Sequence, residues 1–560
     1  MKSKKSRSSD VLIVGAGVSG LYAAWRLLKD NPKQSVTIIE RLDRIGGRLD
    51  TDLIKISDEN TKGKKNSSVV RDEEGGMRFT YEMKELMSLF YGLQLCDEIV
   101  DFPMTTNRYM VRGHSFTTDE AAANDNAIWG ELYDLAPAEQ YQSPGTILNT
   151  IYNRILRANG VDKAPENPTP EFWQEFRLDY KWSGTPLNQW QLGGLFKAMG
   201  YSQECLKMMI DTVGFQAPFL SLVSAGEAWQ ILEDFPKNPH YHTFKYGFST
   251  LTKALQKEVE EMGGRIVLGV NLRGITKSGK DKYALEISPA GPQGKSFQHD
   301  VKTETMEAAK VILAIASNAM QKVFINSPIL NKGEGAIQLW EDIHSIVNMR
   351  LMKINLYFER PWWRDGDTGQ PAIDFGPSFT DLPVNAVYPF YPVDGPFNVA
   401  PAALTIYCDY DNTKFWQGLQ NVGPLFDSPL QQEHSKKPQV LFAASQAVVD
   451  EALKQFKQLF KTHHVPAPVM TSYRNWDGED DFGYAYHQWG INTNDRDVIK
   501  NMTTLVTGEK IYSCNEAWSD MQGWVNGSLR STDLVLTLKE FGLKKIDEEY
   551  HGCPNPDPKS

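Results

Sequence analysis

A glycine-rich stretch near the N-terminus constrains the fold of this chain more than any other feature. The apolar run Val11–Val14 leads into Gly15, Gly17 and Gly20, after which apolar residues recur with helical periodicity. A second apolar run ends at Glu40, 20 residues beyond the last glycine. A buried strand, a glycine turn, a helix and a second strand in this order form the first unit of dinucleotide-binding domains. The sequence therefore predicts an α/β fold with a parallel sheet and a dinucleotide at its first turn.

The three glycines and the acid have separate physical tasks in such a unit. Gly15 permits the tight turn, Gly17 lets the backbone approach a pyrophosphate, and Gly20 lets helix and strand pack closely. The start of the helix supplies free N–H groups and the positive end of its dipole. Glu40 is placed to accept hydrogen bonds from ribose hydroxyls. Glycines alone also occur in turns of unrelated α/β units, but the complete ordered pattern favours the dinucleotide site.

Length and charge exclude several classes of protein. The 560 residues allow two or three domains of ~100–200 residues each. Because 70 acidic residues outnumber 59 basic ones, giving a net charge of −11, a nucleic-acid or anionic-membrane partner is not expected. The first apolar run is too short for a secretory signal, and no uncharged apolar stretch reaches ~18 residues. We therefore expect a cytoplasmic protein that does not enter a membrane.

The cysteines and histidines give no pattern of a disulfide framework or a metal site. Five cysteines are scattered without a CxxC pair, which predicts reduced thiols: Cys96, Cys205, Cys408, Cys514 and Cys553. His240 and His242 lie two residues apart, and His463 and His464 are adjacent, but neither pair has a cysteine or carboxylate at metal-ligand spacing. No metal site is predicted.

The residues after Glu40 distinguish FAD from NAD. Glu40 continues through Arg41 to Gly46-Gly47-Arg48. This segment resembles the E-x(5)-GGR extension of the FAD-dependent amine oxidase superfamily, which contains monoamine, polyamine and L-amino acid oxidases. In that superfamily the extra glycines and arginine wrap the FAD pyrophosphate, whereas NAD dehydrogenases usually stop at the acid. The resemblance implies FAD, held by Gly15, Gly17, Gly20, Glu40, Arg41, Gly47 and Arg48.

A second segment, Glu74–Phe79, resembles the GGMR segment of flavin L-amino acid oxidases. In that family the segment passes the flavin ring, which implies cofactor contacts at Gly76, Met77 and Arg78. The family arginine also binds the α-carboxylate of the substrate, and a planar guanidinium suits this task because it donates two parallel hydrogen bonds. The alternative role for Arg78, outside the resemblance, is a surface salt bridge.

A third segment near the C-terminus is similar to the last FAD motif of the family, in which a strand ends in Gly-Glu and a helix begins beside the flavin. Here Asn515 stands in place of the glycine, so the turn is expected to differ. The implied cofactor contacts are Glu516, Gly523, Trp524 and Val525. Trp524 also matches one wall of the family's aromatic cage around the substrate, although a buried tryptophan is more commonly ordinary core.

The resemblance covers residues 10–545 and implies a discontinuous domain organisation. Apolar runs at 264–275, 283–287 and 311–316 predict further strands. In the family these strands complete a Rossmann-like FAD-binding domain, and the resemblance implies a backbone contact to adenine near Leu272. The expected division is an FAD-binding domain from 1–70, 245–322 and 485–545, an α+β substrate-binding domain from 71–130 and 323–484, a helical domain at 131–244, and a polar tail at 546–560.

Lys353 is the expected catalytic residue. It lies in the alternating, strand-like segment 348–358, and Pro361–Trp363 matches the aromatic continuation that follows in the family. The family lysine contacts flavin N5 through a water, which implies a role in imine hydrolysis or oxygen activation. By position alone, a lysine on a strand is usually a solvated surface residue.

Three further residues are expected at the substrate. Tyr388 follows Thr380–Pro383 and matches a family tyrosine that contacts the substrate carboxylate, although Pro389 replaces a second tyrosine and a core role is the alternative. Trp229 and Asp234 fall in the region that lines the pocket in relatives. Asp234 would pair with a basic side chain or is a simple loop carboxylate. The aromatic residues favour a broad range of neutral and aromatic substrates.

The resemblance implies an FAD-dependent L-amino acid oxidase that converts L-amino acids, O2 and water to 2-oxo acids, ammonia and H2O2. Monoamine oxidases attach FAD through a cysteine, and since 476–485 contains none, noncovalent FAD is expected. The alternatives are a Lys/Arg-specific oxidase, an amino acid 2-monooxygenase, a monoamine or polyamine oxidase, and an FAD-fold binding protein without activity. Homodimers are common in the family.

Overall fold

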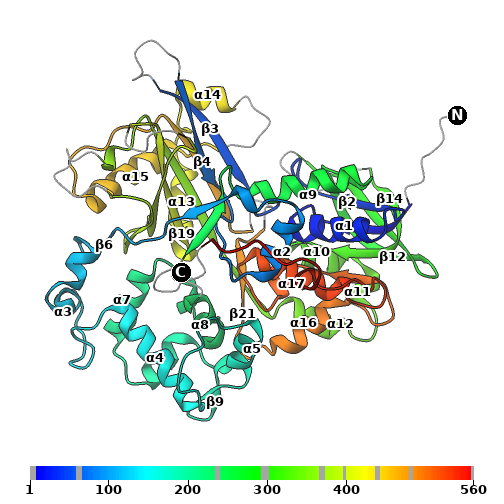
Figure 1. The fold of residues 1–560 in the computed structure, drawn as a ribbon, viewed down its shortest axis with the longest axis horizontal. Helices are drawn as coiled ribbons and strands as arrows, with labels where there is room; N and C mark the ends of the chain where they lie inside the picture. Colours follow the sequence, from blue (N-terminus) through cyan, green and yellow to red (C-terminus); the bar gives the residue numbers. More distant parts are fainter. Residues whose placement is uncertain are drawn as a thin grey trace.

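The computed structural model describes residues 8–58, 66–233, 240–291, 302–364, 373–394, 399–435, 442–478 and 483–556. Figure 1 shows three regions: a first sheet with its helices on the right, a second sheet at the upper left, and a group of helices at the lower left. Each region has a hydrophobic core of its own. The α/β class expected from the sequence is confirmed.

The first sheet contains seven strands in the order β11-β2-β1-β14-β13-β12, with β22 paired to β14. The pairs β11–β2, β2–β1, β1–β14 and β14–β22 are parallel, and β12–β13–β14 are antiparallel. Val11–Val14 is buried, as a parallel strand covered on both faces requires. The strands are β1 (Ser8–Val14), β2 (Val36–Ile39), β11 (Arg265–Val267), β12 (Val270–Gly279), β13 (Lys282–Pro289), β14 (Glu304–Leu313) and β22 (Ile511–Ser513).

Helices cover both faces of this sheet. One hydrophobic core contains α1 (Val18–Asp30), α2 (Lys84–Gly92), α9 (Ser249–Glu261), α17 (Val525–Leu536) and α18 (Ile546–Glu549). The core on the other face contains α10 (Ser317–Asn326), α11 (Pro328–Asn331), α12 (Ala336–Ile343), α16 (Asp495–Thr503) and η7 (Glu516–Trp518). Strands from three distant parts of the chain therefore form one layered unit.

The second sheet also contains seven strands, in the order β20-β16-β19-β18-β17-β6-β7. These are β6 (Arg108–Val111), β7 (His114–Thr117), β16 (Leu351–Phe358), β17 (Ser378–Thr380), β18 (Ala386–Phe390), β19 (Ala402–Asp409) and β20 (Met470–Trp476). Its helices are η5 (Trp362–Arg364), α13 (Tyr410–Gln420), α14 (Pro429–Ser435) and α15 (Gln446–Leu459). The hairpin β3 (Thr51–Asp58) and β4 (Asn66–Glu73) lies against β18 and β19 and joins the two sheets.

Short strand pairs connect the regions. Two antiparallel pairs, β5–β10 and β15–β21, lie between the sheets, and a third closes a turn in the helical region. They are β5 (Ile99–Phe102) with β10 (Tyr241–Phe244), β15 (Ile346–Met349) with β21 (Tyr486–Trp489), and β8 (Lys181–Trp182) with β9 (Thr185–Pro186).

The helical region has its own core of aliphatic and aromatic side chains. Its elements are α3 (Thr118–Leu132), α4 (Pro144–Ala158), α5 (Pro170–Leu178), η2 (Leu187–Gln189), α6 (Leu192–Ala198), α7 (Gln203–Val213), η3 (Ala217–Phe219) and α8 (Ala225–Glu233). Ser143, Thr169 and Ser202 cap α4, α5 and α7, each accepting a hydrogen bond from the amide three residues later. The helical pattern at 190–211 divides into two helices because Gly200, at φ +92°, ends the first. Across the ranges that the structure describes, no helix is both long and apolar enough to cross a bilayer.

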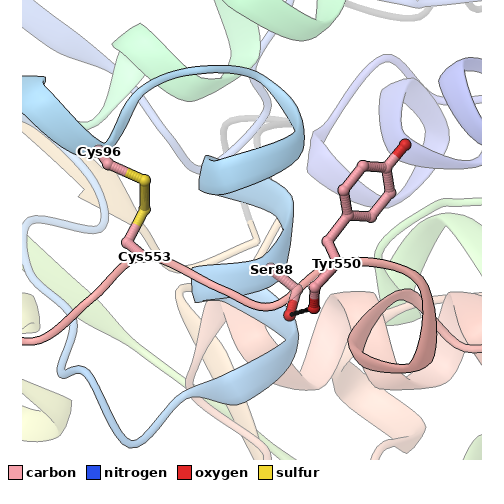
Figure 2. The surroundings of a disulfide bond; sticks show 4 residues. All are labelled: Ser88, Cys96, Tyr550 and Cys553. Carbon is pink, nitrogen blue, oxygen red and sulfur yellow. Dashed lines mark hydrogen bonds between the residues drawn. A yellow bond between two sulfur atoms is a disulfide. The ribbon is translucent and has the colours of Figure 1, made fainter.

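The expectation of reduced thiols is wrong for two of the five cysteines. Cys96, in η1 (Cys96–Glu98), forms a disulfide with Cys553, 457 residues later (Figure 2). The Ser88 hydroxyl on α2 donates a hydrogen bond to the Tyr550 carbonyl at 3.0 Å and fixes this segment against the helix. Residues 546–553, at the start of the segment expected to be a polar tail, therefore pack on α2 and its neighbourhood. No local spacing signals a pair so far apart in sequence, which is why the cysteine pattern missed it.

We expect three free thiols, not five, when the protein is denatured without reductant and titrated, because Cys205, Cys408 and Cys514 are unpaired. Substituting Cys553→Ser is expected to raise amide exchange in 546–553, since a disulfide typically stabilises by ~2–4 kcal/mol. Reductant should reproduce the effect in the wild type and add nothing to the variant. Five reactive thiols in the unreduced protein would contradict the pairing.

Candidate functional site

A cavity of about 490 Å³ opens at the carboxyl ends of the parallel strands β1, β2, β14 and β22. Ligands of open α/β sheets bind at this edge. The cavity brings together most of the residues that the sequence assigns to the cofactor: Gly15, Gly17, Glu40, Arg41, Gly47, Arg48, Gly76, Leu272, Glu516, Gly523, Trp524 and Val525. Gly20, Met77 and Arg78 lie just outside its lining.

The glycines of the first turn differ in what surrounds them. A Cβ on Gly15, which has φ +106°, would lie 2.2 Å from the Ala314 carbonyl oxygen. A Cβ on Gly20 would lie 2.0 Å from the Gly15 carbonyl oxygen. Gly17 has an ordinary φ of −74°, and a Cβ there would meet nothing within 4 Å. Gly15 and Gly20 are thus required by protein packing, whereas the space at Gly17 belongs to the cavity.

Basic side chains exceed acidic ones around the cavity. Its described lining contains the basic residues Arg41, Arg48, Arg273 and Lys322, and the acidic residues Glu40 and Glu516. This excess suits a diphosphate, whose oxygens accept charge-assisted hydrogen bonds. Arg273 and Lys322 were not predicted, because they come from β12 and α10, which have no motif around them.

The Glu40 carboxylate is fixed by backbone amides at the end of β2. Oε2 accepts from the Ala16 amide at 2.7 Å, and Oε1 accepts from the Leu42 amide at 2.8 Å. The Ala16 contact ties Glu40 to the glycine turn. The carboxylate therefore lies at the cavity wall in the position expected for a ribose acceptor.

Glu516 is the most connected acid of the cavity. It accepts hydrogen bonds from Arg48 Nη1 at 2.6 Å, His487 Nδ1 at 3.0 Å, and the amides of His487 and Gly523, each at 3.0 Å. Burial alone would raise the pKa of Glu516, but Arg48 and His487 outweigh burial and hold that pKa well below its usual range. Glu516 is therefore a carboxylate that joins three separate segments.

Asn515 does not need the conformational freedom of the glycine that it replaces. Its backbone is extended, at φ −166°. Its side chain accepts from the Ala517 amide at 2.8 Å, which caps η7, and donates to the Ile315 carbonyl at the end of β14. The asparagine thus holds the turn that presents Glu516 to the cavity.

Aromatic rings and Arg78 lie together beside the cavity. The ring of Tyr241 stacks on Trp524, with centroids 6.2 Å apart and planes at 14°. The Arg78 guanidinium carbon lies 4.8 Å from the Tyr241 ring centroid. Tyr486 lies against Gly523, which has φ +82° and where a Cβ would lie 3.3 Å from the tyrosine ring, so this position favours glycine. Tyr241 and Tyr486 were missed by the sequence reasoning, since only their folded neighbours identify them.

Tyr388 lies close to Arg78, and its ring contacts Tyr407 with ring centroids 5.9 Å apart. Burial raises the pKa of both hydroxyls, and the positive charge of Arg78 acts against it at each. Arg78, Tyr388 and Tyr407 therefore share one buried environment next to the cavity.

Lys353 is buried on β16 and points at the segment that precedes Arg78. Its Nζ donates to the carbonyls of Glu73 and Gly75, at 2.6 Å each, and lies 3.6 Å from Met77 Sδ. It also lies 4.9 Å from the ring centroid of Tyr407. Lys353 is thus not a solvated surface lysine, and its amine contacts the segment that leads to Arg78.

The environment of Lys353 favours its neutral form. Burial lowers its pKa to about 8 from 10.5, although Glu73, Asp72 and Glu74 act in the opposite direction. Arg78 adds to the lowering. An amine that titrates near pH 8 is suited to proton exchange with a bound water at physiological pH.

The lowered pKa predicts a change of stability with pH. Below about pH 8 the folded protein carries the full cost of a charged buried amine, and the cost disappears as pH rises from about 8 to 10.5. Over this range the wild type should therefore gain stability relative to Lys353→Met. The difference between their free energies of unfolding should grow by about 3 kcal/mol at most. Urea unfolding at several pH values measures it, and a constant difference would show that Lys353 titrates normally.

Two predicted pocket residues do not join this site. Trp229 is fully buried in the helical core, with ring centroids 5.9 Å from Tyr152 and 6.2 Å from Phe196, and it is not among the residues that line the cavity. Trp229 lies on the apolar face of α8, which packs on neighbouring helices, so its side chain faces the helical core and not the position expected from relatives. Asp234 lies outside the described residues.

Several known proteins are similar to this chain in sequence or in fold. A family profile described as flavin-containing amine oxidoreductase matches residues 18–421. The uncharacterized protein R188 of Acanthamoeba polyphaga mimivirus is 22% identical, over 96% of this chain and 95% of that protein. The L-amino-acid oxidase of Mus musculus is 25% identical, over 72% of this chain and 54% of that protein. A structure of putrescine oxidase bound to putrescine has a TM-score of 0.60 at 18% identity, over 94% of this chain and 97% of that one.

Proposed function

Because this chain belongs to the flavin-containing amine oxidoreductase family, whose cofactor is FAD, we propose that it is an L-amino acid oxidase. The reaction takes an L-amino acid, O2 and water to the 2-oxo acid, ammonia and H2O2. The observation that carries the proposal is the position of Arg78, buried beside the cavity and next to Tyr241 and Tyr388.

A guanidinium in this place supports a substrate that carries a carboxylate. Arg78 is only 7% exposed, so a carboxylate that reaches it loses most of its water and forms charge-assisted hydrogen bonds of greater strength. Tyr388 lies close enough for its hydroxyl to contribute a second contact. Simple amines have no group that uses these residues, which favours amino acids over amines.

The aromatic rings orient the other end of the substrate. With the carboxylate at Arg78, the amine and Cα extend along Trp524 and Tyr486, which line the cavity. FAD, when held by the residues of the cavity, would supply the acceptor for the hydride of Cα and would pass the electrons to O2. The protein's task is to fix Cα, exclude bulk water and hold a water near Lys353 for hydrolysis of the imino acid.

Noncovalent attachment of FAD is part of the proposal. Gly483 and Ala485 line the cavity where a monoamine oxidase would carry its flavin cysteine. Acid precipitation should release yellow flavin into the supernatant. Flavin that stays with the pellet would contradict this.

A panel of 20 L-amino acids, assayed for both H2O2 and 2-oxo acid, tests the function. Activity with several neutral and aromatic amino acids is expected, with one 2-oxo acid formed per H2O2. Activity confined to lysine and arginine would replace broad specificity with basic specificity. Amide product without H2O2 would indicate a monooxygenase, and oxidation of putrescine or benzylamine alone would indicate an amine oxidase.

A further inference from the structure

A buried histidine that no sequence motif singled out contacts Glu516 at the cavity wall. His487 is on β21 and is fully buried. Its Nδ1 lies 3.0 Å from Glu516 Oε2, and its Nε2 lies 3.0 Å from the Ser317 hydroxyl at the start of α10. The ring thus links the acid of the cavity wall to the first residue of α10, on the same face of the sheet.

The hydrogen-bond partners of His487 indicate a doubly protonated ring. The Ser317 hydroxyl donates to Asn348 Oδ1 at 2.6 Å, so its oxygen is left to accept from Nε2. An ionised Glu516 can only accept, so Nδ1 must donate to it. Both ring nitrogens then act as donors, which is the hydrogen-bonding pattern of an imidazolium.

Glu516 is saturated by this arrangement. A carboxylate offers about four acceptor sites. Donors from Arg48 and Gly523, with the amide and ring of His487, occupy them. Two of these donors belong to His487. Glu516 is therefore better suited to fixing its protein neighbours than to binding FAD directly.

We propose that His487 is a positioning residue of the flavin site, in which a doubly protonated imidazole holds Glu516 and, through it, Arg48 and the Gly523–Trp524 turn. Arg48 is the side chain expected to contact the pyrophosphate, and Trp524 is the side chain expected beside the substrate. The proposal rests on the flavin site and not on the choice of substrate, so it survives if the substrate is a simple amine.

FAD affinity of the refolded or deflavinated protein tests this role without an assay of turnover. His487→Ala should weaken FAD binding by more than tenfold. His487→Asn keeps one neutral donor toward Glu516 and should recover part of the affinity. The control is His434→Asn, which removes a histidine of similar burial from α14 and should leave FAD affinity unchanged.

Two results would overturn the proposal. One is wild-type FAD affinity in His487→Ala. The other is an equal loss of FAD affinity in His487→Ala and in the control His434→Asn, because the loss would then reflect general destabilisation and not the contact with Glu516. A double substitution with Glu516→Gln adds a check, since the two losses should be far from additive if His487 acts through Glu516.

Discussion

Replacing Arg78 with alanine is expected to lower kcat/KM for L-amino acids by roughly ten- to hundredfold. A charge-assisted contact is worth ~1.5–3 kcal/mol, and each 1.4 kcal/mol is tenfold in rate. The loss should appear mainly in KM if the carboxylate is held equally in substrate and transition state, and in kcat if it fixes the position of Cα. Steady-state kinetics with three or four neutral amino acids measures both.

Two comparisons make the Arg78 result specific. The matched control is Arg112→Ala, because Arg112 also packs over a tyrosine, with its guanidinium carbon 4.1 Å from the Tyr133 ring centroid, but outside the cavity. It should leave kcat/KM unchanged. Any residual oxidation of benzylamine should be insensitive to Arg78→Ala, because benzylamine has no carboxylate. An equal loss for both substrates would mean that Arg78 supports the structure and not carboxylate recognition.

Substituting Gly17→Thr is expected to reduce FAD affinity by roughly a hundredfold or more while leaving the apoprotein folded. A Cβ at this position meets no protein atom within 4 Å and the backbone is in an ordinary region, so we expect the fold to tolerate the substitution. Threonine and glycine are similar as helix N-caps, so α1 should keep its stability. The new side chain occupies the space through which the pyrophosphate approaches the backbone. Titration with FAD and the melting temperature of the apoprotein measure the two effects.

Gly20→Ala provides the opposite case three residues away. Its Cβ would lie 2.0 Å from the Gly15 carbonyl oxygen, so β1 and α1 would have to separate. This variant should melt at a lower temperature even without FAD. If Gly17→Thr instead lowers the apoprotein melting temperature as much as Gly20→Ala, the space at Gly17 is not where the cofactor binds.

The sequence predicted those parts of the site that depend on neighbouring residues. Gly15, Gly17 and Gly20 are recognisable because one turn requires them at fixed spacing, and Arg48 because it ends the same loop. Those spacings reflect local backbone geometry, which short segments determine. The structure brings these residues to one cavity with Glu516, which lies almost 500 positions away.

The sequence could not predict residues whose neighbours come from distant segments. His487 is one of ten histidines, and only folding brings it to Glu516 and Ser317. The same is true of the pairing of Cys96 with Cys553. Trp229 was expected at the pocket but lies in the helical core. Its place in the sequence did not show which face of its helix is buried.

The discontinuous first sheet has a consequence for biosynthesis. Gly15 and Gly17 leave the ribosome early, but the cavity is not closed until β22 and the start of α17 are made, beyond residue 510. At about 5–20 residues per second, the two walls are separated by roughly 25–100 s of translation. During that time the nascent chain has the glycine turn at 15–20 but not the segments beyond residue 510 that line the other side of the cavity. A chain that stops short of its last 50 residues therefore lacks the elements that close the cavity.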